Sequence, residues 1–162
     1  MKPIRLLLVD DEAEFRQTIA KRLAKRGLIA DQAADGNGCL SILKKKAMDV
    51  VVLDVKMPGM GGIEVLRNIT EKYPKTEVIL LTGQATASDG VAGIKSGAFD
   101  YLTKPIELEH LFNKILQAFE KIQRQEAEQK EAQNRKQMEQ QMIATERLAS
   151  LGTLAAGVAH EI

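Results

Sequence analysis

Cysteine, tryptophan and long apolar runs are scarce in this sequence. With a single cysteine, Cys39, the chain cannot form an internal disulfide, and a reducing, cytoplasmic compartment is expected. No segment approaches the roughly 18 consecutive apolar residues that span a bilayer, and the N-terminus lacks the apolar stretch of a signal peptide. We therefore predict a cytoplasmic protein that makes no direct membrane contact.

A strong charge of either sign is also missing. The formal net charge is +1, aromatic residues make up 4% of the chain, and the one basic run covers residues 44–46. A nucleic-acid interface needs clustered basic residues with aromatic support, so no nucleic-acid partner is expected. The basic run is better explained as the solvated end of a helix.

Short apolar runs alternate with amphipathic segments over residues 4–120. We expect strands at the apolar runs, which cover residues 4–9, 28–33, 50–53, 78–81 and 101–103. We expect helices between them, over residues 14–26, 40–43, 63–72 and 85–96, and from residue 107 onward. Successive βα units of this kind predict a parallel sheet with helices on both faces.

Glycines mark two of the segments between strands. The run Asp35-Gly36-Asn37-Gly38 predicts a turn before the second helix. The helix over 85–96 carries Gly90 and Gly93, and each glycine costs roughly 0.5–1 kcal/mol relative to alanine in a helix. We therefore expect this helix to be the least stable one.

Polar side chains stand at the ends of four predicted strands. Asp10 and Asp11 follow the first strand, Asp54 ends the third, Thr82 ends the fourth and Lys104 follows the fifth. Because sites in such sheets form at the carboxyl ends of the strands, these side chains are expected to share one crevice. Three carboxylates there repel one another at a cost of roughly 4 kcal/mol per pair. Mg²⁺, which prefers oxygen ligands, would relieve that cost, whereas the carboxylates are too distant in sequence for a calcium-binding loop.

Two of these residues have simpler explanations when taken singly. Lys104 would suit a surface salt bridge, and Thr82 would suit a helix or turn cap. Together with a metal ion, they would neutralise the oxygens of a phosphoryl group during its transfer. Asp54, at the end of a strand expected in the middle of the sheet, is then the candidate nucleophile that forms an acyl phosphate.

Residues 4–120 resemble the receiver domain of response regulators. The matching segments are Val9-Asp10-Asp11-Glu12, Leu53-Asp54-Val55-Lys56-Met57-Pro58-Gly59-Met60, Leu81-Thr82-Gly83 and Ala98-Phe99-Asp100-Tyr101-Leu102-Thr103-Lys104-Pro105. The resemblance implies an α/β, flavodoxin-like fold, with a doubly wound five-stranded parallel sheet of order 2-1-3-4-5. A long C-terminal helix or coiled coil would follow it.

The same resemblance implies a role for each site residue. Asp54 would be the phosphoacceptor and a ligand of Mg²⁺, together with Asp10, Asp11 and the backbone carbonyl of Lys56. Lys104 would contact the phosphoryl group, and Thr82 and Tyr101 would form a switch pair. The Lys104-Pro105 peptide bond would be cis. The sequence departs from the family at Gly61-Gly62, where Asp-Gly is common, and this departure is expected to change loop flexibility only.

The C-terminal part of the chain differs in composition. Residues 123–141 are almost wholly polar or alanine, which favours a solvated helix or a weakly specified coiled coil. Apolar residues then return at the 3-4 spacing of a helix-pair seam. They are Leu148, Leu151, Ala155, Val158 and Ile162. This seam predicts a parallel homodimer through the C-terminal helix.

Residues 146–162 resemble the start of the dimerisation and phosphoacceptor helix of a histidine kinase. The matching run is Glu146-Arg147-Leu148-Ala149-Ser150-Leu151-Gly152-Thr153-Leu154-Ala155-Ala156-Gly157-Val158-Ala159-His160-Glu161-Ile162. The resemblance implies that His160 accepts a phosphoryl group and that Glu161 assists it. No nucleotide-binding motif occurs in the 162 residues, so autokinase activity of this chain alone is not expected.

The expected organisation is a receiver domain over 1–121, a helical coiled-coil linker over 122–145 and a truncated kinase helix over 146–162. The leading hypothesis is a phosphorelay receiver that regulates an attached histidine kinase core. A response regulator with a helical interaction tail and no kinase activity is an alternative, and a phosphate sink is another. The expected partners are a phosphodonor histidine kinase or phosphotransfer protein and a second copy of the chain.

Overall fold

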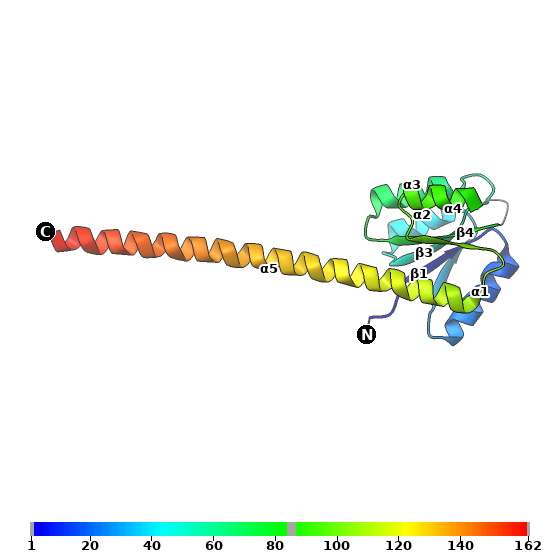
Figure 1. The fold of residues 1–162 in the computed structure, drawn as a ribbon, viewed down its shortest axis with the longest axis horizontal. Coiled ribbons are helices and arrows are strands. Elements are labelled where there is room, and N and C mark those ends of the chain that lie inside the picture. Colours follow the sequence, from blue (N-terminus) through cyan, green and yellow to red (C-terminus); the bar gives the residue numbers. More distant parts are fainter. Residues whose placement is uncertain (1, 84–86, 162) are drawn as a thin grey trace. The chain divides into compact units, whose positions relative to one another are not determined.

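The computed structural model describes residues 2–83 and 87–161, with the side chains of residues 87 and 153–161 outside that description. The chain divides into two units, Met1–Ile122 and Gln123–Ile162. Figure 1 shows the elements of both units along the chain. Among the described helices, none combines the length and the hydropathy of a membrane span.

Five parallel strands form the centre of the first unit. They are β1 (Leu6–Val9), β2 (Ala30–Ala33), β3 (Val50–Asp54), β4 (Glu77–Thr82) and β5 (Asp100–Thr103). Their order in the sheet is β2-β1-β3-β4-β5, and each neighbouring pair is parallel. The flavodoxin-like order implied by the sequence is confirmed, and β3 lies in the middle of the sheet.

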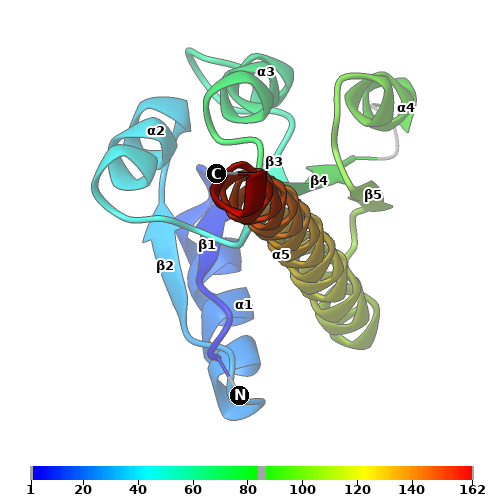
Figure 2. The same ribbon diagram turned by 90° about the vertical axis from the view of Figure 1, so that its left-hand side faces the viewer.

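Helices cover both faces of this sheet (Figure 2). They are α1 (Ala13–Lys25), α2 (Gly36–Lys45), α3 (Gly62–Lys72), α4 (Ala87–Lys95) and α5 (Leu108–Glu161). Alternate residues of each central strand enter different cores, because strand side chains point to opposite faces in turn. Val51 and Leu53 pack with α2 and α3, whereas Val50 and Val52 pack with α1 and the beginning of α5. This double burial explains the unbroken apolar run of β3.

Several predicted boundaries in this unit are wrong. Strands β1 and β2 each begin two residues later than predicted, at Leu6 and Ala30, and α2 begins at Gly36, inside the predicted turn. Asp35 is the N-cap of α2, and its carboxylate accepts a hydrogen bond of 2.7 Å from the backbone N–H of Gly38. Asp and Asn are common both in turns and at helix N-caps, and the sequence pattern alone predicted a turn where the structure has an N-cap.

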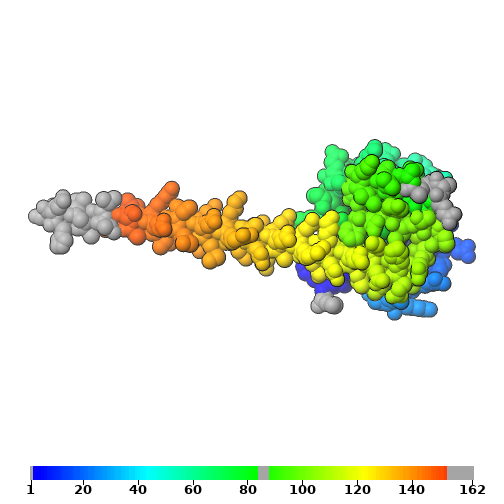
Figure 3. Space-filling model, in the orientation of Figure 1, coloured from blue at the N-terminus to red at the C-terminus, as the bar shows by residue number. Residues whose placement is uncertain are grey.

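The second unit is the continuation of α5. Every residue from 123 to 152 is exposed, and Figure 3 shows one face of this stretch. Opposite charges four residues apart, such as Glu126 with Lys130 and Glu131 with Arg135, favour a helix without a buried face. This segment is therefore helical because of the helix propensity of its residues, and not because it buries an apolar face.

Candidate functional site

Three carboxylates meet at the carboxyl ends of β1 and β3. The two strands are parallel neighbours with Val9 paired to Leu53, so the aspartates that follow these residues stand at the same level. One oxygen from each of Asp10, Asp11 and Asp54 lies within 4.8 Å of the others. Asp10 and Asp54 are buried, with exposed fractions of 2% and 5%, whereas Asp11 is exposed. The cluster predicted from the sequence is therefore present at this edge of the sheet.

Lys104 brings a positive charge to the cluster from the loop after β5. Its ammonium Nζ lies 3.0 Å from Oδ2 of Asp10 and 3.6 Å from Oδ2 of Asp54. The backbone N–H of Lys104 donates to the carbonyl of Thr82, and the Lys104-Pro105 peptide is cis, as the resemblance implied. The ammonium also lies 4.4 Å from the centre of the Phe15 ring, a cation–π contact that the sequence did not reveal.

Burial dominates the electrostatics of Asp54. Loss of solvent, followed by the neighbouring charge of Asp10, raises the pKa of Asp54 to about 6, against the opposing effect of Lys104. Burial alone would lower the pKa of Lys104, but its hydrogen bond to Asp10 and the charge of Asp54 outweigh burial, so this pKa is raised. Lys104 therefore stays charged beside a carboxylate that is ionised at neutral pH but held at a cost.

Thr82, at the end of β4, carries a buried hydroxyl that has no hydrogen-bond partner among the described residues. An unpaired buried hydroxyl is costly, so its presence at the end of a central strand needs a reason. The strand pairing places Leu81 beside Asp54. Thr82, the next residue of β4, therefore lies at the same edge of the sheet as the carboxylate cluster. With respect to the described residues, its hydroxyl is therefore available as a donor for a ligand bound there.

Tyr101, on β5, lies half-buried against α4. A Cβ built on Gly90 of α4 would stand only 2.5 Å from Cδ2 of the Tyr101 ring. A Cβ on Gly93 would stand 2.1 Å from Cδ1 of Leu80. The two glycines that suggested an unstable helix therefore allow α4 to pack closely on β4 and β5.

Gly62, the first residue of α3, is a further residue whose role the sequence did not reveal. A Cβ there would lie 2.4 Å from the carbonyl oxygen of Asp54 and 2.6 Å from Cα of Val55. The N–H of Gly62 donates to the carbonyl of Val55 at 2.9 Å. Gly62 therefore lets α3 approach the backbone that carries Asp54. The departure from Asp-Gly falls on Gly61, where a Cβ would meet nothing within 4 Å, and its effect on loop flexibility stays a prediction.

The remaining candidate residues are placed less fully. Lys56 is exposed, and its backbone N–H donates to Oδ1 of Asp54 at 3.4 Å. The side chains of His160 and Glu161 lie outside the described residues. The arrangement as a whole combines oxygen ligands suited to a divalent cation with a fixed ammonium and a free hydroxyl donor. Such a site can bind an anionic group against a metal ion.

The raised pKa of Asp54 predicts a pH-dependent stability. An unfolded aspartate has a pKa of about 4, whereas the folded Asp54 has a pKa of about 6. The stability contributed by the protonated carboxyl is complete below the unfolded pKa and is lost as the pH rises through the folded pKa. In the absence of divalent cations, Asp54→Asn should therefore unfold at a higher temperature than the parent at pH 7, with little difference near pH 4.

Thermal unfolding followed by circular dichroism at both pH values measures this effect. Asp54→Ala removes the same charge and should show the same dependence on pH. A stabilisation of Asp54→Asn that is equal at the two pH values would contradict the assigned cause.

The close approach at Gly62 predicts a second effect on stability. Gly62→Ala should lower the free energy of unfolding by roughly 1–3 kcal/mol, because backbone atoms must move to admit the methyl group. Gly61→Ala is the matched control, since a Cβ at Gly61 meets nothing within 4 Å and its φ of −69° suits any residue. The control should change stability by no more than about 0.5 kcal/mol. Urea unfolding compares the two variants, and equal losses would contradict the packing argument.

Comparison with known proteins matches the fold and the site to one family. Residues 6–116 match the model of the response regulator receiver domain. The chain is 37% identical over 112 residues to the transcriptional regulatory protein TcrA of Mycobacterium tuberculosis, covering 69% of this chain and 44% of TcrA. It is 36% identical over 113 residues to the response regulator MprA of Mycolicibacterium vanbaalenii, covering 70% of this chain and 49% of MprA. The chain thus spans less than half the length of these relatives.

Solved structures agree. A response regulator receiver domain protein from Clostridium thermocellum has a TM-score of 0.70 and 32% identity, over 73% of this chain and 95% of that one. The receiver domain of the Francisella response regulator 1452 has a TM-score of 0.68 and 29% identity, over 74% and 98%. With its sheet order, its aspartate cluster and this match, the chain belongs to the receiver domain family of two-component response regulators.

Proposed function

We propose that Asp54 accepts a phosphoryl group from a phosphohistidine of a histidine kinase or of a phosphotransfer protein. The observation that carries this proposal is the convergence of the buried Asp54 carboxylate, the Lys104 ammonium and the unpartnered Thr82 hydroxyl. Mg²⁺ fits the site, since the three clustered carboxylates supply the oxygen ligands that this ion prefers. Asp10, Asp11, Asp54 and the carbonyl of Lys56 would hold it.

The transfer step uses the ionised form of Asp54. An oxygen of the carboxylate attacks the phosphorus atom, the bond from phosphorus to the donor nitrogen breaks, and the electron pair leaves with the imidazole. When bound, Mg²⁺ supplies charge that offsets the phosphoryl oxygens and the crowded carboxylates. Lys104 is near enough to Asp54 to pair with one phosphoryl oxygen, and the Thr82 hydroxyl can donate a hydrogen bond to another.

We further propose that α5 carries the signal away from the site. Two ion pairs hold this helix to β5 and β4, the strands that carry Tyr101 and Thr82. Lys114 pairs with Asp100 of β5 at 2.7 Å, and Lys121 pairs with the buried Glu77 of β4 at 3.0 Å. A shift of Thr82 and Tyr101, the proposed switch pair, would therefore reach α5 through the strands that carry them.

The output that fits the comparisons is that of a response regulator with a helical interaction tail. TcrA and MprA, by their names, are a transcriptional regulatory protein and a response regulator. In this reading residues 1–121 are the receiver, and residues 122–145 and 146–162 form a helical segment that binds a second copy of the chain. The homodimer would be parallel, and its affinity would be modest because the middle of the helix is polar.

A fused histidine kinase is a second candidate, and one specific observation favours it. Residues 146–162 resemble the start of a kinase dimerisation and phosphoacceptor helix, with His160 and Glu161 in the reactive positions. In this reading the receiver regulates kinase output through the same helix.

The acceptor role of Asp54 gives a direct test. With a small phosphodonor and Mg²⁺, the chain should gain one base-labile phosphoryl group, detected by intact mass spectrometry. Asp54→Asn should abolish the gain, and so should removal of Mg²⁺ by a chelator, because the carboxylates would then repel the incoming anion. Asn68→Asp is a suitable control, since it adds a carboxylate on α3 without touching the cluster. Undiminished labelling of Asp54→Asn would refute the assignment.

The kinase reading is tested separately in the longest protein that the gene encodes. That protein, incubated with γ-labelled ATP, should gain an acid-labile phosphohistidine that disappears in His160→Gln. The kinase reading would be refuted by labelling that persists in this variant. It would also be refuted by the absence of histidine labelling in a protein whose Asp54 still accepts phosphoryl groups, and the response-regulator reading would then remain.

A further inference from the structure

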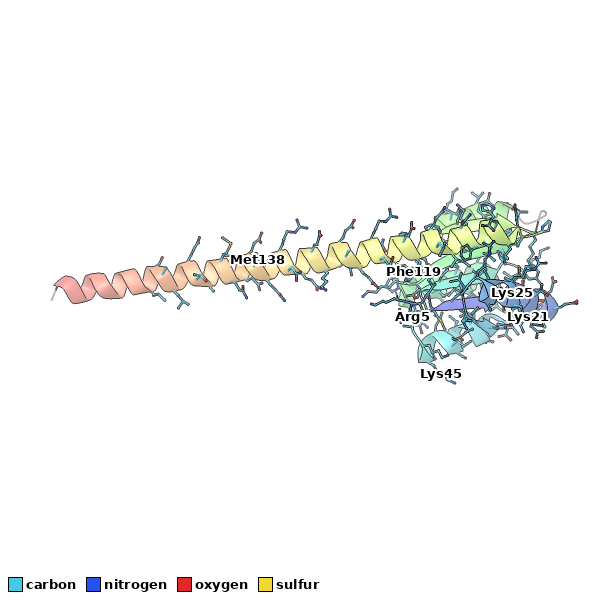
Figure 4. All side chains as sticks on the ribbon, turned by 90° about the horizontal axis from the view of Figure 1, so that it is seen from below. Arg5, Lys21, Lys25, Lys45, Phe119 and Met138 are labelled. Atoms are coloured by element: carbon cyan, nitrogen blue, oxygen red, sulfur yellow. The ribbon has the colours of Figure 1, made fainter. Side chains whose placement is uncertain are left out.

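The second unit leaves large apolar side chains in water. Among residues 123–152, five such side chains are at least half exposed. They are Met138, Met142, Ile143, Leu148 and Leu151. Figure 4 shows Met138 extending outward from the helix. Burying side chains of this size is worth roughly 1.5–3 kcal/mol each, so a partner that covers them would bind favourably.

Four of the residues along this helix frame a hollow. Met138, Gln141, Met142 and Thr145, together with Glu146, line a shallow depression of about 350 Å³. Their spacing is i, i+3, i+4 and i+7, which places all four on one face of the helix. In coiled coils, a hole formed by four residues at this spacing accepts one side chain from the facing helix. The hollow thus has the form of a coiled-coil hole.

We propose that a second copy of this chain, running parallel, inserts its Met142 into this hole. With Met142 at heptad position a, Met138 and Thr145 take position d and Gln141 takes position g. In a parallel pair, a knob at position a enters a hole made by d, g, a and d of the other helix, so the same residue serves as knob and as part of the hole. This inference deepens the homodimer of the proposed function by naming the faces that meet.

The charges beside the seam favour the parallel arrangement. Glu139 and Glu146 take position e in this register. A parallel pair sets each of them opposite a neutral g residue of the other helix, Asn134 or Gln141. An antiparallel pair would instead set the two e positions opposite one another, acid against acid, which is destabilising.

The seam begins at Met138. Continued toward the N-terminus, the same register would place Arg135 at position a and Glu131 at position d. In a parallel dimer each of these would face its own copy, charge against like charge. The preceding part of the helix is therefore outside the contact.

The seam also changes register within a few residues. A strict heptad continued from Met142 and Thr145 would use Ala149 and Gly152, which have little to bury. The large apolar side chains stand one residue earlier, at Leu148 and Leu151. The step from Thr145 to Leu148 is thus three residues where a heptad has four, and such a step overwinds a coiled coil locally. The geometry points to an interface that shifts faces between residues 145 and 148.

Disulfide trapping in the full chain tests both the face and the step. The native Cys39 does not interfere, because burial raises the pKa of its thiol to about 12. Single-cysteine substitutions Met142→Cys and Thr145→Cys place a thiol in the proposed seam. Gln141→Cys and Ala144→Cys place one where an uninterrupted heptad from Leu148 would run. Ile143→Cys, an exposed apolar residue on another face, is the matched control.

Under mild oxidation at high micromolar concentration, the Met142 and Thr145 variants should form disulfide dimers about tenfold faster than the other three, because bridging requires Cβ atoms about 4 Å apart. Faster trapping at Gln141 and Ala144 would overturn the register step. Equal trapping at all five positions, or trapping at none, would overturn the interface.

Sedimentation supplies an independent measurement. Met142→Glu should shift the chain toward monomer, whereas Ile143→Glu should leave the distribution of the parent unchanged. Equal effects of the two substitutions would overturn the proposal. Both variants should still accept a phosphoryl group on Asp54. A failure of Asp54 labelling would therefore count against the proposed function but not against the proposed interface.

Discussion

The ammonium group of Lys104 stands 3.0 Å from Asp10 and 3.6 Å from Asp54, two carboxylates that are almost completely removed from water. Two such charges at close range destabilise a fold unless a cation lies between them. The chain places this cation through the order of its sheet. β5 lies beside β4, and β4 lies beside β3. In the loop after β5, the backbone N–H of Lys104 donates a hydrogen bond to the carbonyl of Thr82. The doubly wound topology thus assembles the site from residues that are 94 positions apart.

Close backbone approaches position the parts of this site. Gly62 lets the start of α3 lie against the peptide that carries Asp54, and Gly90 lets α4 lie against the ring of Tyr101. Glycine costs helix stability in isolation, but here the missing Cβ is what allows helix and sheet to pack. The consequence for function is that Asp54 and Tyr101 are each held by a contact that a single methyl group would disturb.

Helix α5 lies in two different physical environments along its length. Up to Ile122 its inner face is buried at the spacing of a core helix, at Leu111, Ile115 and Ala118. Beyond that point all described residues are exposed, and the helix depends on propensity and charge spacing. A segment of this kind gains little from folding alone, so association through its few large apolar side chains has a disproportionate effect on its stability.

The sequence by itself determined the strands, since unbroken or nearly unbroken apolar runs mark β1, β3 and β4. Together with its resemblance to a known family, it also determined the sheet order and the residues at the strand ends. The register of Val9 with Leu53, which brings Asp10 to Asp54, follows from a topology that successive βα units already limit. Only the tertiary structure decided what surrounds those residues. It places the Phe15 ring beside Lys104, leaves the Thr82 hydroxyl without a partner among the described residues, and makes the contacts that require Gly62 and Gly90. It also decided that Asp35 caps a helix rather than starting a turn. Sequence periodicity reports which face of an element is apolar, whereas these features depend on distances of a few ångströms between elements that are far apart in the chain.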